Sequence, residues 1–594
     1  MITPMKKLTL LCLARDQHKT LTELRDLGVV HLVHVEEPDG ADLDAARHKL
    51  SRAEKALDTI RRAAKEAAPG QTLGVPAAGS PVDLVATIEQ MTDHRATLVE
   101  EQHGLLQEKA RIEPFGDFDP SQLNDLHHHG LTLRLCRSAE KDPIDLPAGA
   151  TSFLINQDGE TAYSLVVSQS PIRSSGHDIA PTTQSLSATL SRIDAISLEL
   201  TTIDSTFAGH GSAPAALVTH VATLSEEVAF LEARSGMGSA ERIAYLQGYC
   251  PAERAASIES AAGEHGWGTL IEETSADEMV PTLLKSPKWV QPIKAVFDVI
   301  KILPGYREQD ISMVFLIFFS IFFAMLIGDA GYGLLFLAGT WFARFRMKKA
   351  PSYPFTMLTV LSIGTVIWGT LTGNYFGMPT QHAPFSGLQI DWLTDQKHIM
   401  ALCFLIGAVH MTIAHVWRML TLIGSKKALE QVGWICVVWS MFFIARQLVA
   451  EVEAPGFTMI MLGVGIALIA LFMATLKELK TEWINLAMLP LSIVSALVDV
   501  ISYIRLFAVG MASLAVAQSF NEMALGIGFS NVFAGFCAAL ILFFGHLLNI
   551  ILCGLAVLVH GVRLNTLEFS MHMNMEWSGV PYTPFARTHT QRTE

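Results

Sequence analysis

The stretch ISYIRLFAVG, residues 501–510, places one arginine inside a long apolar segment. Between residues 484 and 520 the only formal charges are Asp499 and Arg505. An unpaired arginine at mid-membrane depth costs at least about 2.5–3.5 kcal/mol on insertion scales, so its side chain should face protein or water. The segment therefore predicts a membrane helix that carries a functional cation.

The two halves of the chain differ in charge. Residues 1–300 contain 26 Lys and Arg against 42 Asp and Glu, whereas residues 301–594 contain 17 against 15. The first half is typical of an acidic soluble protein and the second of a membrane protein, and neither has the basic surface of a nucleic-acid-binding protein. The N-terminus lacks the apolar core of a signal peptide, so the first half is expected in the cytoplasm.

The sequence offers little for catalysis or metal binding. The seven cysteines form no CxxC pair, which favours ordinary packing residues in a reducing compartment. His127–His129 have no flanking ligand pattern, so a polar turn is a better interpretation than a metal site. Without GxxxxGK[ST], HExxH or GxSxG, the chain is not expected to hydrolyse ATP itself, and neither a cofactor nor a metal is predicted.

The soluble half has two similar α/β patterns near its ends. Each reads as strand, helix and strand, at 6–13, 16–27 and 29–36 and again at 245–250, 251–264 and 268–274. Heptad-like apolar stripes at 50–67 and 217–231 lie between these two patterns, and strand-like runs at 131–138, 151–156 and 162–169 lie between the stripes. An ordinary packed helix explains either stripe alone. Together they favour two small α/β lobes joined by an antiparallel coiled coil, with a loop at 67–82.

The membrane half contains eight apolar segments. They lie at about 311–328, 330–345, 355–373, 399–417, 431–449, 457–476, 484–522 and 531–566. Six of them are close to the roughly 20 residues that span a bilayer. We therefore predict an all-α domain of eight membrane helices. The domains are an arm at 1–300, a membrane domain at 301–577 and a cytoplasmic tail at 578–594.

Basic residues set the predicted orientation. With a cytoplasmic N-terminus, the inner loops and tail hold the following residues: Arg344, Arg346, Lys348, Lys349, Arg418, Lys426, Lys427, Lys477, Lys480, Arg587 and Arg592. The outer loops hold few basic residues, as the positive-inside rule requires. Both termini are thus predicted in the cytoplasm, in a membrane that is most simply a prokaryotic plasma membrane.

The last two apolar segments are unusually long. At 1.5 Å per residue they would extend about 58 Å and 54 Å, against a hydrocarbon core of about 30 Å. Each is too short for two spans, so each should be one strongly tilted or bent helix. Such helices suit a protein that lies against another object in the membrane.

These two segments carry most of the polar residues predicted at membrane depth. A structural ion pair of Arg505 with Asp499 is disfavoured. Six residues turn about 600° along one straight helix, which leaves the two side chains on nearly opposite faces. Snorkelling to the cytoplasmic face is an alternative role for Arg563. The candidate ion-translocation residues are Asp499, Arg505, Ser513, Gln518, His546, Asn549, His560, Arg563 and Glu568.

Several motifs resemble the a subunit, or subunit I, of V/A-type rotary ion-translocating ATPases. They are PTLLKSPKWVQPI (281–293), FAMLIGDAGYGLL (323–335), GNYFG (373–377), SYIRLFAVG (502–510) and VHGVRLNTLEF (559–569). The resemblance covers nearly the whole chain. It implies that the long helices lie against a rotating ring of proteolipid c subunits, and that Arg505 is the essential arginine. Arg563 corresponds to a second buried arginine and Glu568 to the acidic residue after it.

The same resemblance implies partners and a mechanism. The partners are the proteolipid ring, coiled-coil peripheral stalks on the arm, a central-stalk cap subunit and the lipid bilayer, with no nucleic acid. A ring carboxylate can cross lipid only when neutral, whereas a nearby guanidinium favours its ionised form. Because arginine stays charged, it would force ion release and separate two half-channels. This couples proton or sodium translocation to ATP hydrolysis or synthesis.

Two positions depart from the eukaryotic branch of the family. Ser513 stands where that branch often has histidine, and Cys553 stands where it has an acidic residue. The exit path is therefore not transferable, and His546, Asn549 and His560 are the substitutes that we predict.

Two other functions were weighed. A secondary ion transporter with an accessory cytoplasmic domain would predict inverted repeats with broken helices in matched halves, which the sequence does not show. A purely structural membrane anchor would leave Arg505 without a purpose.

Overall fold

The computed structural model divides into two compact units. One comprises residues 1–8, 248–261 and 270–584, and the other 9–247, 262–269 and 585–594. The structure describes residues 1–66, 80–139, 146, 149–159, 161–170, 178–179, 182–209, 214–348, 350–378, 386–473, 483–528 and 531–587. Most of the predicted loop at 67–82 lies outside these residues, as do Lys349, Lys477, Lys480 and Arg592.

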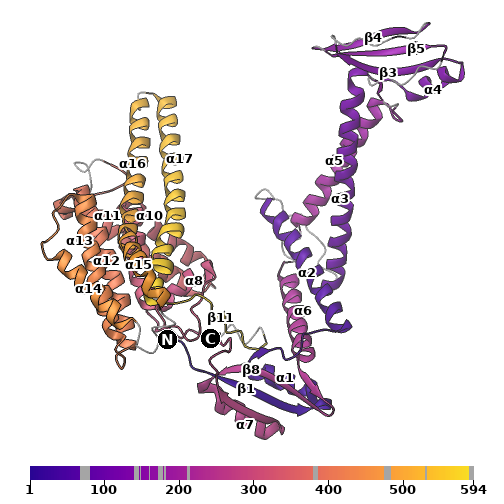
Figure 1. Ribbon diagram of the computed structural model, residues 1–594. Helices are drawn as coiled ribbons and strands as arrows, with labels where there is room; N and C mark the ends of the chain where they lie inside the picture. Colours follow the sequence, from indigo (N-terminus) through magenta and orange to yellow (C-terminus); the bar gives the residue numbers. More distant parts are fainter. Residues whose placement is uncertain are drawn as a thin grey trace. The chain divides into compact units, whose positions relative to one another are not determined.

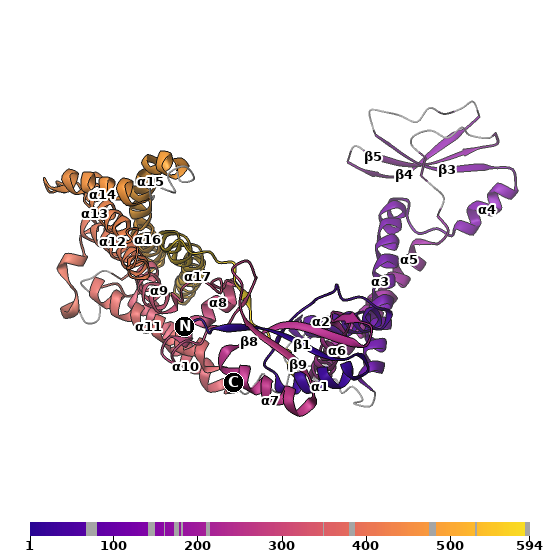
Figure 2. The same cartoon turned by 60° about the horizontal axis from the view of Figure 1, so that its bottom comes forward.

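Four long helices form the middle of the unit around residues 9–247. They are α2 (Ala41–Glu66), α3 (Pro81–Ile112), α5 (Leu186–Gly209) and α6 (Pro214–Ser235). Their apolar stripes share one core, which includes Leu57 and Ile60 of α2 and Leu217 of α6. The two predicted helices correspond to α2 and α6. A second pair, α3 and α5, lies side by side and lengthens the helical region (Figures 1 and 2).

Arginine–carboxylate pairs show which way these helices run. Arg52 of α2 donates two hydrogen bonds to Glu89 of α3, with Nε 2.8 Å from Oε1 and 3.0 Å from Oε2, and a third from Nη2. Farther along, Nε of Arg192 on α5 lies 2.7 Å from Oε1 of Glu101 on α3. Additional pairs join Arg95 to Asp204 and Arg47 to Glu232. Early residues of α3 thus meet late residues of α5, which is an antiparallel arrangement.

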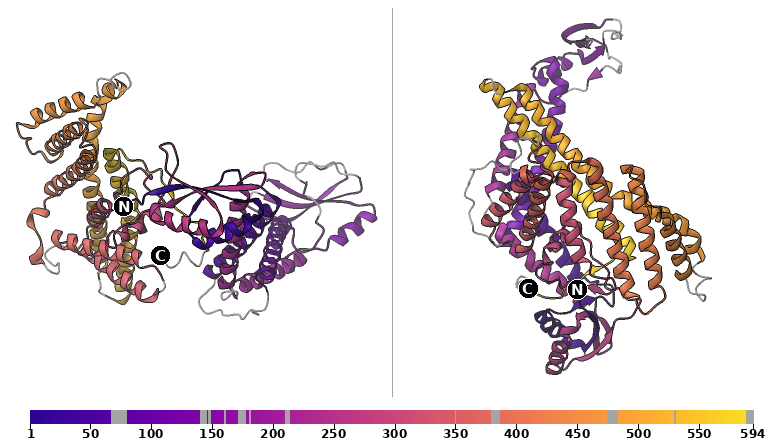
Figure 3. Two further views of the ribbon diagram at one scale, coloured as in Figure 1. Left: turned by 90° about the horizontal axis from the view of Figure 1, so that it is seen from below. Right: turned by 90° about the vertical axis from the view of Figure 1, so that its left-hand side faces the viewer.

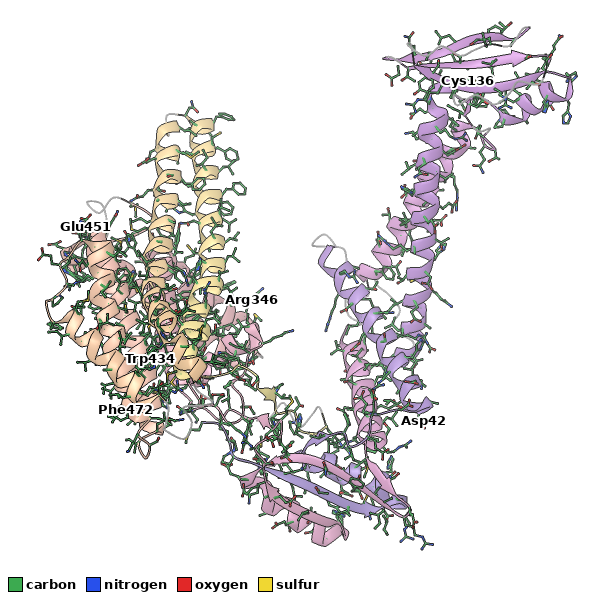
Figure 4. The ribbon with its side chains drawn as sticks, in the orientation of Figure 1. Asp42, Cys136, Arg346, Trp434, Glu451 and Phe472 are labelled. Carbon is green, nitrogen blue, oxygen red and sulfur yellow. The ribbon has the colours of Figure 1, made fainter. Side chains whose placement is uncertain are left out.

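A four-stranded antiparallel sheet lies at the far end of α3 and α5 (Figure 1). Its order is β4 (Thr151–Asp158), β5 (Thr161–Ser168), β3 (Thr132–Ala139) and β6 (Asp178–Ile179). The first three were predicted from the alternating sequence. Cys136, marked in Figure 4, is buried within β3. His127 and His128 end the short helix α4 (Pro120–His128), and His129 is its C-cap.

The second sheet is formed by the strands of the two α/β patterns that were predicted near the ends of the soluble half. Its strands are ordered β2 (His31–Val33), β8 (Ile243–Pro251), β1 (Met5–Leu13) and β9 (Gly268–Glu273), and β7 (Gly238–Ala240) also pairs with β8. Helices α1 (Gln17–Leu27) and α7 (Ala255–His265) follow β1 and β8 along the chain. The boundary between the two units falls inside β1 and β8.

The other unit is dominated by apolar helices. After α8 (Lys294–Ile300), they are α9 (Ser312–Ile327), α10 (Ala330–Arg346), α11 (Ser352–Thr372), α12 (Gln396–Thr421), α13 (Ala428–Ala450), α14 (Thr458–Phe472), α15 (Trp483–Ser502), α16 (Ile504–Ile527) and α17 (Val532–Ala556). Glu451 and Phe472 lie at opposite ends of this group (Figure 4), as expected for antiparallel α13 and α14. Helices α16 and α17 run side by side (Figures 1 and 3).

Among the described residues, five helices are long and apolar enough to cross a membrane by length and composition. They are Ser352–Thr372, Gln396–Thr421, Ala428–Ala450, Ala487–Ile527 and Val532–Met573. Two shorter apolar helices, Ser312–Ile327 and Thr458–Phe472, accompany them. A multi-pass membrane protein is therefore well supported, whereas eight spans and the tilt of the last two remain predictions.

Both long segments depart from regular α-helix near the candidate residues. The first is interrupted at Tyr503, between α15 and α16 and two residues before Arg505. The second passes from α17 into two π-helical stretches, η9 (Val557–Gly561) and η10 (Leu564–Phe569), before α18 (Ser570–Met573). Such π-turns are rare and occur often at functional sites.

The tail after α18 returns to the base of this unit. Its strand β11 (Val580–Pro581) pairs in parallel with β10 (Pro281–Thr282), and the backbone N–H of Gly579 donates to the carbonyl of Leu303 at 3.1 Å. A side chain at Gly579 would meet the Pro304 carbonyl oxygen at 2.2 Å, so this close approach requires glycine.

Candidate functional site

Arg505 points at a buried carboxylate from the neighbouring long segment. Its Nη1 donates to Oε1 of Glu568 at 3.1 Å, and its Nη2 donates to the hydroxyl of Ser502. Ser502 in turn donates to the same carboxylate oxygen at 3.1 Å. The Glu568 side chain is only 4% exposed, whereas that of Arg505 is 27% exposed. The contacts with Glu568 and Ser502 thus fix the guanidinium of Arg505, while part of the arginine side chain stays exposed.

Arg563 approaches the same carboxylate. Its Nε lies 3.5 Å from Oε1 of Glu568, and its side chain is 51% exposed. In a regular α-helix, residues five apart differ by about 140° around the axis and do not face each other. In a π-helical stretch the i to i+5 pairing brings them together. The η10 π-turn therefore explains how two guanidinium groups reach one carboxylate.

The interruption at Tyr503 is held in place by α12. The hydroxyl of Tyr503 is 2.8 Å from Nδ1 of His410, whose ring stacks against Phe569 with centroids 4.4 Å apart. A Cβ at Gly407 would come within 2.6 Å of the Tyr503 ring, so the small residue makes room for it. These buried contacts fix the start of α16 and hence the base of Arg505.

Asp499 lies beside a different partner. Its Oδ2 is 3.3 Å from Nε2 of His572, and Nδ1 of His572 is 3.0 Å from Nε2 of His415. Nδ1 of His415 is 2.9 Å from Oε1 of Gln431. The His415 ring lies parallel to Trp434, which Figure 4 marks, at a centroid distance of 6.1 Å. Asp499 thus ends a polar chain contributed by α12, α13, α15 and α18.

A second polar group joins α10, α16 and α17. The Tyr332 hydroxyl is 2.7 Å from Nδ1 of His546 and accepts from Nδ2 of Asn549 at 3.0 Å. Asn549 also donates to the carbonyl of Ser513 at 2.9 Å, and the Ser513 hydroxyl is 3.1 Å from the Cys553 thiol. The predicted residues Ser513, His546 and Asn549 are therefore neighbours.

The GDAGYG motif positions this second group. Oδ1 of Asp329 accepts from the backbone N–H groups of Gly331 and Tyr332 at 2.8 and 3.2 Å, which caps α10. Its Oδ2 accepts from the N–H of Gly377 at 3.1 Å. The aspartate therefore ties the start of α10 to the GNYFG segment.

Gln518 lines a cavity of about 430 Å³. The cavity extends along one face of α16 to Leu506, the residue after Arg505. Its lining comprises Met325, Gly328, Trp368, Thr372, Asn374, Met378, Gln389, Leu393, Thr394, Gln396, Ile399, Leu506, Phe507, Gly510, Met511, Leu514 and Gln518. Gln389, Thr394 and Gln396 come from the predicted outer loop and the start of α12, so the cavity connects that region with the α16 face.

The predicted residues therefore fall into separate groups. Arg505, Arg563 and Glu568 meet directly, and Ser513, His546 and Asn549 form another group, whereas Asp499 joins two histidines that sequence reasoning missed. His560 lies half-buried in η9. The missed residues are Tyr332, His415, Gln431, Ser502 and His572. Tyr332 and Ser502 stood inside the quoted motifs, while nothing in the sequence linked His415, Gln431 and His572.

No family model matches the chain. It is 29% identical over 626 residues to V-type ATP synthase subunit I 1 of Treponema pallidum, covering 98% of this chain and 100% of that relative. V-type ATP synthase subunit I of Borreliella burgdorferi is 28% identical, with 99% and 100% covered. A-type ATP synthase subunit I of Methanocaldococcus jannaschii is 27% identical over 61% of this chain and 58% of the relative.

A solved structure of the cytoplasmic N-terminal domain of subunit I, a homologue of subunit a of V-ATPase, covers 45% of this chain and 99% of that domain. Its 18% identity and TM-score of 0.21 are too low to carry a statement about the fold. The sequence matches do not depend on it. Over nearly its whole length the chain is therefore similar to bacterial V-type ATP synthase subunit I, and over about three fifths of its length to the archaeal A-type subunit I.

Proposed function

We propose that this chain is the static membrane subunit of a V/A-type rotary ATPase. It would form the ion half-channels beside a rotating proteolipid ring and anchor the peripheral stalks through its arm. The observation that carries the proposal is the charge balance around Glu568. Arg505 and Arg563 both approach this single carboxylate, so the three side chains sum to one positive charge.

Among the residues that the structure describes, this cluster keeps a net positive charge, which fits a carboxylate that arrives from outside the chain. A ring carboxylate must be neutral in lipid, where an exposed charge costs several kcal/mol or more. Beside a guanidinium its ionised form is favoured, and arginine does not lose its own proton. The ring carboxylate would therefore release its ion at Arg505. Each unit charge that crosses 100 mV corresponds to about 2.3 kcal/mol of available work.

The polar groups on either side support two access paths. The cavity that Gln518 lines begins among residues of the predicted outer loop and ends at Leu506. The group around Tyr332, His546 and Asn549 lies along the same helix pair. We propose these as outer access, and the surroundings of Asp499 and His560 as part of the inner path. Protons or sodium ions could be the transported species.

The predicted topology is part of this proposal. Eight spans would place residues 1–300 and the tail 578–594 in the cytoplasm, with residues 301–577 in a prokaryotic plasma membrane. In this arrangement the acidic arm would meet the stalks, and a central-stalk cap subunit would lie nearby. The chain itself would not hydrolyse ATP.

Disulfide crosslinking in the assembled complex tests the contact with the ring. Ala508 is exposed on α16 three residues after Arg505, so Ala508→Cys should crosslink to a cysteine placed near the ring carboxylate. Val464 on α14 is 49% exposed, and Val464→Cys serves as the matched control. Crosslinking of the control but not of Ala508→Cys would contradict the proposal.

A secondary ion transporter is the remaining alternative. It would translocate ions without a ring and without ATP, so the isolated chain should transport ions in vesicles. Transport that requires the assembled complex favours the rotary function.

A further inference from the structure

The turn between α10 and α11 concentrates positive charge. Arg344, Arg346, Lys348 and Lys349 lie within six residues of the chain, whereas no Asp or Glu occurs from residue 330 to residue 390. Among the described residues, neither Arg346 nor Lys348 forms an ion pair, and both side chains are exposed. These two cations are therefore available to an anion from outside the chain.

Contacts between α10 and α11 fix the position of this turn. A Cβ at Gly333 would come within 2.8 Å of the backbone nitrogen of Val366, so the early part of α10 lies against the late part of α11. At the other end, the guanidinium carbon of Arg344 lies 5.4 Å from the centroid of the Phe355 ring. Nη1 of Arg344 also donates to the carbonyl oxygen of Ala350 at 3.2 Å, which closes the turn. Because α11 is long and apolar enough to cross a membrane, the turn lies where such a span would begin.

The two unpaired cations line a hollow together with apolar side chains. This hollow has a volume of about 640 Å³, and its lining comprises Phe345, Arg346, Met347, Lys348 and Ala350. Arg346 is marked in Figure 4. Nζ of Lys348 lies 5.4 Å from the centroid of the Phe345 ring, within the range of a cation–π contact. The hollow thus presents positive charge and apolar surface side by side.

Exposed aromatic side chains precede the hollow along α10. Trp341, Phe342 and Phe345 are 67%, 68% and 70% exposed. Phe345 follows Phe342 by three residues and Trp341 by four, so the three rings lie on one side of the helix. Tryptophan is enriched where the hydrocarbon of a membrane meets the head groups. This side of α10 therefore suits acyl chains, and the hollow at its end suits a charged head group.

We propose that this hollow binds the head group of an anionic phospholipid. The lipid phosphate accepts hydrogen bonds from Arg346 and Lys348, and the acyl chains lie along Trp341 and Phe342. Clusters of basic residues beside a membrane helix are typical of sites for anionic lipids. The positive-inside rule accounts for basic residues in an inner loop, but not for two unpaired cations that share a hollow with apolar side chains. Such a site does not require a proteolipid ring, so it is independent of the proposed function.

Quenching of Trp341 fluorescence by brominated lipids tests this site in the assembled complex. The complex is placed in nanodiscs of phosphatidylcholine that contain increasing fractions of either brominated phosphatidylglycerol or brominated phosphatidylcholine. The chain contains 10 tryptophans, so the signal of Trp341 is the difference between the unaltered chain and Trp341→Phe. Half-maximal quenching should need an about tenfold lower fraction of the brominated phosphatidylglycerol, since each basic residue near an anionic lipid contributes several-fold in affinity.

Two matched double variants separate a lipid site from a general attraction to positive charge. Arg346→Gln with Lys348→Gln removes both cations of the hollow and should make the two lipids quench equally, and either single variant should give an intermediate preference. Because both side chains are exposed, the complex should still assemble. Lys426→Gln with Lys427→Gln removes the same charge from another predicted inner loop and should keep the preference.

Three results would overturn the lipid site. The first is equal quenching by both lipids in the unaltered chain. The second is a preference that the two double variants both keep or both lose. The third is displacement of the brominated phosphatidylglycerol by an excess of inorganic phosphate, which would indicate a site for free anions.

Discussion

Nη1 of Arg505 and Oε1 of Glu568 lie 3.1 Å apart although 63 residues separate them in the chain. The contact joins the start of α16 to the π-turn η10. The contact orients the Arg505 guanidinium. It does not neutralise the positive charge of the Arg505, Arg563 and Glu568 side chains together, because Arg563 approaches the same carboxylate oxygen. Removal of one partner of a fully buried ion pair typically costs about 3–5 kcal/mol, and the cost here should be smaller, because the side chains of Arg505 and Arg563 are 27% and 51% exposed.

Replacement of Glu568 by glutamine should therefore damage the complex more than replacement of Arg563. Glu568→Gln leaves two guanidinium groups without a counter-charge, and we expect reduced assembly in addition to lost transport. Arg563→Gln keeps the Arg505–Glu568 pair, so the complex should assemble with partial transport. The double variant should assemble better than Glu568→Gln alone. Equal assembly of all three in membrane extracts would contradict this charge balance.

The topology can be checked with accessibility reagents. Tags at residues 1 and 594 should both be protected from outside reagents in intact cells. A cysteine at Asp391, in the short turn Asp391–Leu393 before α12, should react with a membrane-impermeant label. An externally accessible C-terminus would rule out the eight-span arrangement.

The arm should bind the peripheral stalks without the membrane domain. A fragment of residues 1–285 contains α2, α3, α5 and α6 with their shared core, so it should be soluble, strongly helical by circular dichroism and able to capture the stalk subunits. A fragment carrying Leu57→Asp, which places a charge in that core, is the control and should lose both helix and binding. A folded fragment that binds no stalk subunit would remove this role.

The thiol of Cys136 provides a pH test of the four-stranded sheet of the arm, in which Cys136 is buried within β3. Burial, and then the charge of Asp178 beside it, raise the pKa of Cys136 to about 11. Below that pH the thiol stays protonated, so at pH 8 only about one molecule in a thousand should carry the thiolate. Alkylation should be slow at pH 8 and rise steeply toward pH 11. Asp178→Asn should speed it several-fold at pH 8, and unchanged rates would contradict this cause.

The sequence predicted the parts of this site that depend on local pattern. Arg505 stood out because charge is expensive inside an apolar segment, and its phase relative to Asp499 argued against a pair within one straight helix. In the structure each of the two residues has a different neighbour, Glu568 and His572. Glu568 was included as a polar residue of the last apolar segment and through the family resemblance, but its contact with Arg505 was not predicted, because 63 residues separate the two in the chain.

Other features could not be predicted because they depend on tertiary packing. The π-turn that brings Arg563 and Glu568 together has no distinct hydrophobic period. The contact between His415 and His572 joins residues 157 apart. In the arm, the two predicted apolar stripes lie in α2 and α6, which led us to expect a single helical pair. Helices α3 and α5 lie between these stripes in the sequence and were not predicted.

The measurement that most directly tests the central claim is ATP-driven ion transport by reconstituted complexes with Arg505 replaced. If Arg505 is the permanent cation that faces the ring, Arg505→Gln should assemble fully and transport nothing. Arg505→Lys should be severely impaired, because an ammonium can lose its proton when desolvated and lacks the planar fork of a guanidinium. Asp499→Asn should be much milder at neutral pH, with Arg563→Gln between these extremes. An assembled Arg505→Gln complex that transports ions at the wild-type rate would contradict the account.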